Sequence, residues 1–196
     1  VSIEAEAERH KWTEVWQVGN EGCLGLALIV GREFSTYRRV ALIDGRALRI
    51  PRQEFHAKVC ELSSLRRVLL QYLFVVLMQT SRLSACNLRH SVSQRVARWL
   101  LLANDRHGGT DLHVTQSVLA RVLGIRRASV STCLGQLEEL GYVRKERGTI
   151  LVTDPRGLER IACSCYALIR REFDRGSSDL PAFDEHGAGR ATEQLL

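Results

Sequence analysis

The sequence predicts an α+β fold: short strands come first, one long helix follows, and a small helical domain that contains a β-hairpin comes last. Residues 1–50 alternate between apolar and polar side chains or are interrupted by turn residues, which is typical of strands. Residues 64–90 carry apolar side chains at three- and four-residue steps, as a long helix does. With 196 residues, 45% of them hydrophobic, the chain can build more than one domain with a buried core.

The first domain is expected to span residues 1–61, with about five short strands before residue 50. Residues 1–8 alternate strictly between apolar and polar side chains, which indicates a half-buried strand. Residues 12–18 predict a second strand after a polar turn.

Residues 40–50 predict a hairpin around Asp44-Gly45, because this dipeptide tolerates the positive φ angles of a tight turn. Pro51 suits the first turn of a helix that runs to about Cys60. The strands therefore end where a short helix begins.

The long helix is assigned to residues 62–90. Its apolar stripe is continuous over roughly seven turns, which is long for a globular helix. Such a stripe suits a partner helix; the alternative is a helix that packs inside its own monomer. Its longest apolar run, Val68–Met78, is interrupted by Gln71 and is too short to span a membrane.

A further domain is predicted over residues 91–175. Ser91 and Gln94 have the spacing of a capping box, so a helix is expected to begin there and to end at Gly108-Gly109. Residues 176–196 show no periodicity and predict a flexible tail.

Residues 111–152 hold the most informative pattern. Thr115 or Ser117 can cap a short helix over residues 116–123, and Gly124 suits the tight turn to a second helix over residues 126–140. Two short helices joined by such a turn form a helix-turn-helix. Residues 142–152 then give two β-prone runs around an Arg-Gly turn, so a basic hairpin follows and the whole is a winged helix.

The second helix of this motif is interpreted as a DNA probe. Its apolar positions point inward and leave a face of small and polar side chains outward, where a recognition helix meets base edges in the major groove. We predict that the bases are read by Arg127, Ala128, Ser131 and Thr132. We predict that the phosphates are contacted by Gln116, Ser117, Arg126, Ser129, Gln136, Lys145 and Arg147. The alternative is that Arg126 and Arg127 are only a solvated helix end.

The charge of the chain is consistent with a polyanionic partner. The formal net charge is +6, and residues 91–175 contain 14 Lys and Arg against nine Asp and Glu. No arrangement of nucleophile, base and acid typical of an enzyme is present, so no catalytic residue is predicted.

The six cysteines and six histidines predict no metal site. They contain no CxxC or HExxH pattern, and Cys163 and Cys165 are expected on one helix over residues 155–174. Side chains two apart on a helix diverge by about 200°, so the two thiols could not bind one ion. A redox role for either remains an open alternative. The absence of a signal-peptide pattern predicts a cytoplasmic protein.

The chain resembles the Crp/Fnr family of bacterial transcription regulators from about residue 12 to residue 175. The residues that carry the resemblance are Ser91–Leu100 (SVSQRVARWL), Leu112–Ala120 (LHVTQSVLA), Gly124–Ser131 (GIRRASVS) and Glu138–Val143 (EELGYV). The resemblance implies an α+β fold with a β-roll sensor like a cyclic-nucleotide-binding jelly roll, a long dimerisation helix and a C-terminal winged helix-turn-helix. It also implies a homodimer that binds a pseudo-palindromic site on double-stranded DNA, with RNA polymerase as a further candidate partner and no role for a membrane. The dimer seam would then contain Leu69, Tyr72, Leu73, Val76, Leu77 and Leu83.

The chain departs from the family pattern in two places. Arg127 matches the first arginine of the family's recognition helix, but Ala128 and Thr132 replace its Glu and second Arg, so a different target sequence is expected. Residues 22–26 resemble the family's phosphate-binding cassette, yet Cys23 stands where a glutamate would grip the ribose. We therefore expect no cofactor and no binding of a cyclic nucleotide. An unknown small effector would use Gly22, Cys23, Gly25, Arg38 and Arg39.

A full β-roll has about eight strands, so the sensor is expected to be partial, either because strands precede Val1 or because the domain is reduced. An alternative function follows from this view: a ligand-sensing β-roll module whose DNA-binding domain is weak or vestigial.

Overall fold

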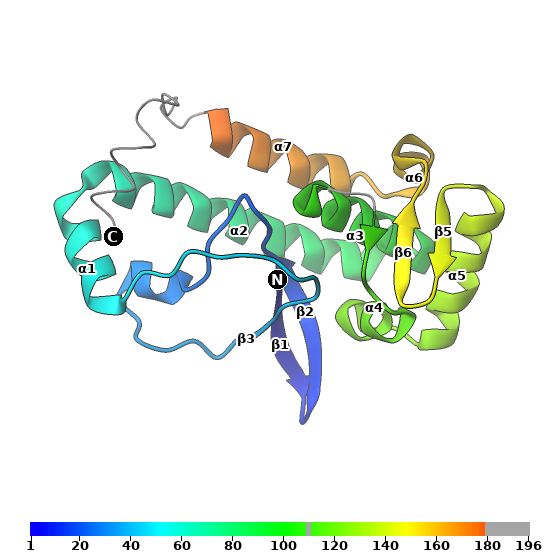
Figure 1. Ribbon diagram of the computed structural model, residues 1–196, viewed down its shortest axis with the longest axis horizontal. Helices are drawn as coiled ribbons and strands as arrows, with labels where there is room; N and C mark the ends of the chain where they lie inside the picture. The colour runs from blue at the N-terminus through cyan, green and yellow to red at the C-terminus, as the bar shows by residue number, and fades with distance from the viewer. Residues whose placement is uncertain (109–110, 179–196) are drawn as a thin grey trace.

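The computed structural model describes residues 1–108 and 111–178, and it confirms the α+β fold class (Figure 1). Two small sheets, a 3-10 helix and a set of α-helices make up this part of the chain. In chain order they are β1 (Ser2–Glu8), β2 (Lys11–Gln17), η1 (Leu26–Val30), β3 (Arg38–Val40), α1 (Arg52–Glu61), α2 (Ser63–Arg89), α3 (Val92–His107), β4 (Asp111–Leu112), α4 (Gln116–Leu123), α5 (Arg127–Glu139), β5 (Val143–Glu146), β6 (Thr149–Val152), α6 (Pro155–Ile161) and α7 (Cys165–Ser178). The predicted tail lies outside the described residues from 179 onward.

The N-terminal sheet has the antiparallel order β2-β1-β3, so it holds three strands where about five were expected. The predicted hairpin at Asp44-Gly45 is wrong, because the chain after Val40 forms no strand up to Pro51. Both edges of β1 are already paired, and nothing covers the second half of the expected hairpin: Leu48 is 98% exposed. An isolated pair of strands without a packed face is only marginally stable in water.

The β1–β2 hairpin packs against the C-terminal domain through buried polar contacts. Glu4 on β1 is fully buried, and its Oε2 accepts a hydrogen bond from Arg38 Nη2 at 2.5 Å, while its Oε1 pairs with Arg121 of α4. On β2, Glu14 Oε1 accepts a hydrogen bond from Trp99 Nε1 of α3 at 2.8 Å. These contacts fix the small sheet to α3 and to α4, the first helix of the predicted helix-turn-helix.

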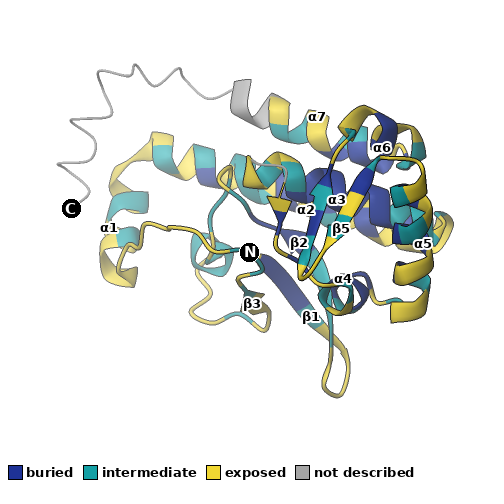
Figure 2. Cartoon of the chain, turned by 45° about the vertical axis from the view of Figure 1, so that its right-hand side comes forward, coloured by how far each residue is buried: buried dark blue, intermediate teal, exposed yellow. Residues whose placement is uncertain are grey.

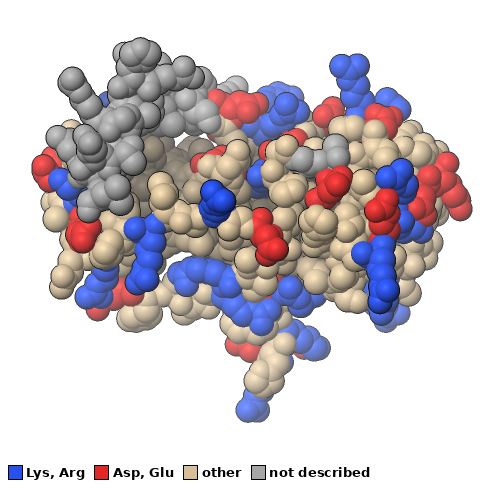
Figure 3. All heavy atoms as spheres, viewed as in Figure 1, with Lys and Arg blue, Asp and Glu red and all other residues tan. Residues whose placement is uncertain are grey.

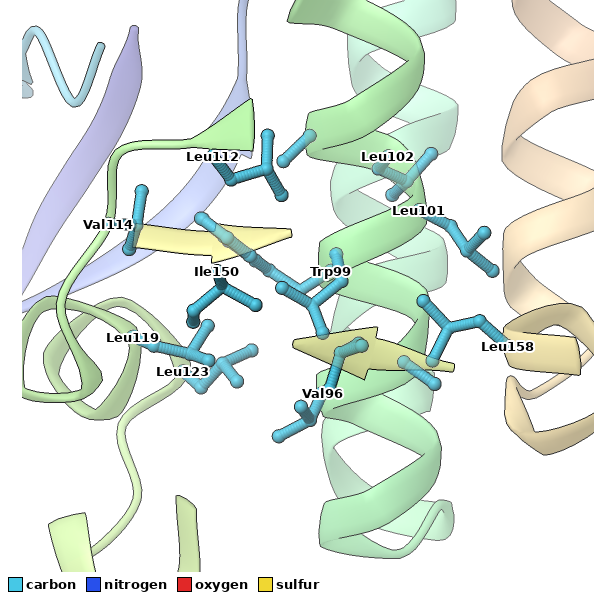
Figure 4. Close-up of a cluster of buried hydrophobic side chains, with 14 of the residues drawn as sticks. Val96, Trp99, Leu101, Leu102, Leu112, Val114, Leu119, Leu123, Ile150 and Leu158 are labelled. Atoms are coloured by element: carbon cyan, nitrogen blue, oxygen red, sulfur yellow. The ribbon is translucent and has the colours of Figure 1, made fainter. Parts of the chain in front are cut away.

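The main hydrophobic core lies between α3, α4, α5, α6 and the second sheet, which has the order β4-β6-β5. Figure 4 shows Trp99 and Val96 of α3 surrounded by Leu119 of α4 and Ile150 of β6. In Figure 2 the buried residues gather in this part of the chain, whereas α1 and the segment before it are mostly exposed. The C-terminal domain therefore carries its own core.

The helix predicted over residues 155–174 is broken into α6 and α7. The backbone of Ala162 is extended, with φ −61° and ψ 151°, and Cys163 and Ser164 lie between the two helices. The break lets α7 turn back and lie alongside α2, where it buries Tyr166 and Ile169 (Figure 1). Tertiary packing thus overrides a helical pattern that was continuous in the sequence.

Gly124 is the residue on which the turn between α4 and α5 depends. It caps α4 in the left-handed region, with φ 62° and ψ 38°. A Cβ there would meet only Thr13, at an ordinary 3.5 Å, so the cost of Gly124→Ala comes from backbone strain. We expect a loss of about 1–2 kcal/mol in the free energy of unfolding, measured by urea denaturation.

Gly135→Ala is the matched control. Gly135 lies inside α5 at a negative φ, and a Cβ there would meet nothing within 4 Å. Alanine is the better helix former, so this variant should gain up to about 1 kcal/mol. Equal effects of the two substitutions would contradict the assignment of strain to Gly124.

Candidate DNA interface

Side-chain caps mark the starts of α3 and α4, as predicted. Ser91 and Gln94 form a capping box at the start of α3, and the Thr115 hydroxyl accepts the Val118 N–H at the start of α4. Arg95 of α3 then donates to the carbonyl oxygen of Leu123 at 2.6 Å. This bond satisfies the last turn of α4 and holds the helix-turn-helix against α3.

The second helix of the motif, α5, has one buried face and one exposed face. Val130, Cys133, Leu134 and Leu137 are all buried, as the sequence predicts. Four exposed side chains occupy the opposite face, and they are the predicted base-reading residues Arg127, Ala128, Ser131 and Thr132. Because all but Arg127 are small, the backbone of α5 is open to close approach by a flat or grooved partner.

The predicted phosphate-contacting residues surround that face. They are exposed at Ser117, Arg126, Gln136 and Arg147 and half-buried at Gln116, Ser129 and Lys145. A shallow hollow of 360 Å³ lies between α5 and the start of α3, lined by Ser129 and Gln136 among others. The side chains are thus brought to one end of the domain, while their contacts with a nucleic acid stay a prediction.

The hairpin beside α5 is the predicted wing, with β5 and β6 paired from Val143 to Val152. Its turn contains Gly148 at φ 80°. Lys145 is not free at the tip: its Nζ lies 2.7 Å from Glu138 Oε2, and its ammonium and backbone N–H hold the pKa of the Glu138 carboxyl below its ordinary value. Arg147 is exposed at the turn and forms no ion pair with the described residues.

Basic side chains do not form a single patch on the face of the molecule shown in Figure 3. Lys and Arg are interspersed there with Asp and Glu, including over the right-hand end where α5 and the wing lie. On this face, an attraction to a polyanion would therefore depend on individual groups, and Arg126, Arg127 and Arg147 are the predicted ones.

Of the predicted effector residues, Gly22 and Arg38 are in close contact with other side chains, whereas Arg39 is exposed. Gly22 is packed against α2 so closely that a Cβ would lie 2.1 Å from the Tyr72 hydroxyl oxygen. Arg38 is held by Glu4 and stacks over the Trp12 ring at 4.9 Å, so its guanidinium is already engaged. Arg39 is exposed on β3. An effector pocket built from them, together with Cys23 and Gly25, stays a prediction.

The predicted dimer seam needs correction. Leu69, Val76 and Leu83 are buried within their own chain, Val76 against Ile3 and Trp16, and Tyr72 packs on Gly22. The sequence stripe was wide enough to include the face of α2 that the rest of the monomer covers. Leu73 is half-buried, and Leu77 alone of the predicted six is exposed.

A different apolar face of α2 is open. It consists of the residues that alternate at steps of four and three, which we call the exposed α2 stripe: Leu70, Phe74, Leu77, Ser81, Ser84 and Leu88. Its four apolar members are 44%, 56%, 58% and 84% exposed in chain order. By length and composition α2 is also apolar enough to cross a membrane, contrary to the expectation from residues 68–78. A single helix of this kind is weak evidence for a membrane span, because the core helix of a soluble protein passes the same test.

The sequence reasoning missed a cluster of four side chains: Cys86, His90, Cys163 and Cys165. The argument that Cys163 and Cys165 must diverge fails because the helix breaks between them. Cys86 and His90 stand four residues apart at the end of α2, so they share one helix face. That spacing was the signal that could have been read in the sequence.

Comparison with known proteins gives one matching domain and two solved structures with a similar fold. Residues 94–161 match the family described as the Crp-like helix-turn-helix domain. A transcriptional regulator of the CRP/FNR family from Thermus thermophilus shares the fold with a TM-score of 0.61 and 23% identity, over 82% of each chain. A crp/fnr family protein from Eubacterium rectale has a TM-score of 0.55 and 17% identity, over 82% of this chain and 75% of that one. No curated protein matches significantly.

Proposed function

We propose that this chain is a transcription regulator of the Crp/Fnr type that acts as a homodimer on a pseudo-palindromic DNA site. The match of residues 94–161 to the Crp-like helix-turn-helix domain supports this proposal. The observation that carries the proposal is the exposed face of α5, where Arg127 projects beside Ala128 and Ser131 with the wing alongside. A guanidinium at the start of such a helix suits a bidentate contact with guanine.

The exposed α2 stripe supports the dimer. Its steps of four and three residues are the heptad spacing by which two helices pack together. The hydroxyls of Ser81 and Ser84 donate to carbonyl oxygens of their own helix, at 2.9 and 3.1 Å, so they bring little polarity to this face. A second copy of α2 would cover Leu70, Phe74, Leu77 and Leu88 and remove apolar surface from water.

The remaining roles follow from the same assignment. We assign a regulatory role and no catalytic residue, and the match of residues 94–161 to the Crp-like helix-turn-helix domain supports this assignment. We assign the protein to the cytoplasm, where duplex DNA and RNA polymerase are accessible, and leave the effector open. Cyclic nucleotide is disfavoured by Cys23 and by the engagement of Arg38 with Glu4.

Selection of bound duplexes from a random pool, with the full chain, tests the proposal. We expect one enriched sequence with two symmetric half-sites whose centres lie about one DNA turn apart, roughly 34–36 Å. An unenriched pool, with equal binding of all duplexes, would overturn it. Thermal stabilisation by a small molecule in a chain that ignores DNA at low salt would instead support the sensor-module alternative.

The wing should contribute to affinity without reading sequence. Arg147 is exposed and unpaired among the described residues, so Arg147→Ala should weaken binding to every duplex and lower the slope of log K against log salt by about 0.9. Fluorescence anisotropy at several salt concentrations measures this slope. Lys145→Ala provides the comparison: because Lys145 already pairs with Glu138, its loss should change the slope less. A larger effect at Lys145 than at Arg147 would contradict this view of the wing.

A further inference from the structure

Three thiols and one imidazole meet where the C-terminal domain joins the long helix. Cys86 and His90 come from the end of α2, Cys163 lies in the break between α6 and α7, and Cys165 is the first residue of α7. One ligand atom from each lies within 4.8 Å of all the others. The three cysteines are buried and His90 is half-buried, so the group is closed off from most of the solvent.

The distances within this cluster fit a single tetrahedral ion. A zinc ion with bonds of about 2.3 Å to sulfur and about 2.0 Å to nitrogen places two sulfurs about 3.8 Å apart, and a sulfur and a nitrogen about 3.5 Å apart. The Cys86 and Cys163 sulfurs are 3.5 Å apart, and Cys165 Sγ lies 3.7 Å from His90 Nδ1. An iron–sulfur cluster would spread its ligands over several irons, which this compact set does not do.

A buried cation completes the surroundings. Arg98 of α3 is 3% exposed, forms no ion pair with an acid among the described residues, and its Nε has no hydrogen-bond partner there. Three thiolates around a divalent cation carry a net charge of −1, which a neighbouring guanidinium would stabilise. The charge of Arg98 acts on both Cys86 and Cys165, which places the guanidinium close to the cluster.

We propose that Cys86, His90, Cys163 and Cys165 form a structural zinc site that closes the two ends of the DNA-binding domain onto each other. The donor set of three cysteines and one histidine is one that structural zinc sites use, and no coordination position is left for a substrate. On binding, the three thiols release their protons to water and each sulfur donates an electron pair to the metal. Helices α3 to α6 lie in the sequence between His90 and Cys163. An ion bound to both pairs of ligands would therefore hold the end of this segment against α2.

Metal analysis of the reduced, full-length protein tests this site in the absence of DNA, independently of the proposed function. We expect about one equivalent of zinc per chain, removed by a chelator with a fall in the unfolding temperature. Cobalt in place of zinc should give the intense visible absorption of a tetrahedral thiolate complex. Cys165→Ser and His90→Ala should bind zinc at least about 100-fold more weakly, and circular dichroism reports whether each variant is folded.

Cys60→Ser is the matched control, because Cys60 is exposed on α1 and lies outside the cluster. It should bind zinc as the unaltered chain does. The proposal is overturned if the reduced unaltered chain binds no zinc, if cobalt gives only a weak octahedral spectrum, or if Cys60→Ser loses zinc as Cys165→Ser does. It is equally overturned if air forms a Cys86–Cys163 disulfide at the same rate with and without zinc.

Discussion

Phe74→Glu is expected to convert the dimer into a monomer. Phe74 lies in the middle of the exposed α2 stripe and is 56% exposed in the single chain, so glutamate there costs the isolated monomer little. In the dimer the new carboxylate would be buried against its symmetry mate and against apolar side chains, which is strongly unfavourable. We expect the dimer to weaken by about 2–4 kcal/mol, or roughly 30- to 1000-fold, in analytical ultracentrifugation.

Arg82→Glu is the matched control on the same helix. Arg82 is exposed and lies off the stripe: its direction around the helix axis is about 120° from the mean direction of Leu77 and Ser81. The added negative charge should therefore leave the dimer intact. DNA binding should fall with the dimer in Phe74→Glu, because a monomer contacts only one half-site. A dimeric Phe74→Glu protein would show that the chains associate through another surface.

Arg127→Ala should reduce affinity for the selected site by about 1–3 kcal/mol and relax the preference at one base position. The reason is the position of Arg127 in the first turn of α5, exposed and beside the small residue Ala128. A bidentate guanidinium contact distinguishes guanine from the other bases, whereas alanine does not. Anisotropy on the selected duplex and on single-base variants of it gives both quantities.

Arg126→Ala separates base reading from simple attraction. Arg126 is the N-cap of α5 and is also exposed, but it is predicted to contact phosphate. Its removal should weaken all duplexes to a similar extent and keep the sequence preference. If Arg127→Ala behaves in the same uniform way, the role of Arg127 in specificity is refuted.

The helix-turn-helix could be predicted from the sequence because its signals are local. The starts of α3 and α4 are set by the caps of Ser91, Gln94 and Thr115, and the end of α4 is set by Gly124. Each of these residues acts on backbone within a few positions of itself. The hairpin around Asp44-Gly45 failed because a turn signal does not supply the neighbour that a strand needs.

Features that depend on distant parts of the chain were the ones that could not be predicted from the sequence. The break before α7 arises from packing against α2, and it brings Cys163 next to Cys86, 77 positions away. The covered face of α2 is likewise set by β1 and β2, through Ile3 and Trp16, so the apolar pattern alone could not tell the inner face from the open one.

Glu4 links the charges of the N-terminal sheet to those of the helix-turn-helix. Its single buried carboxylate forms ion pairs with both Arg38 from β3, through Oε2, and Arg121 from α4, through Oε1. If a signal pulled β3 away, the carboxylate would be left with one counterion in a site shielded from water, and its balance with α4 would change at once. A displacement of residues 38–40 would then affect α4, the first helix of the motif, through the side chain of Glu4 alone.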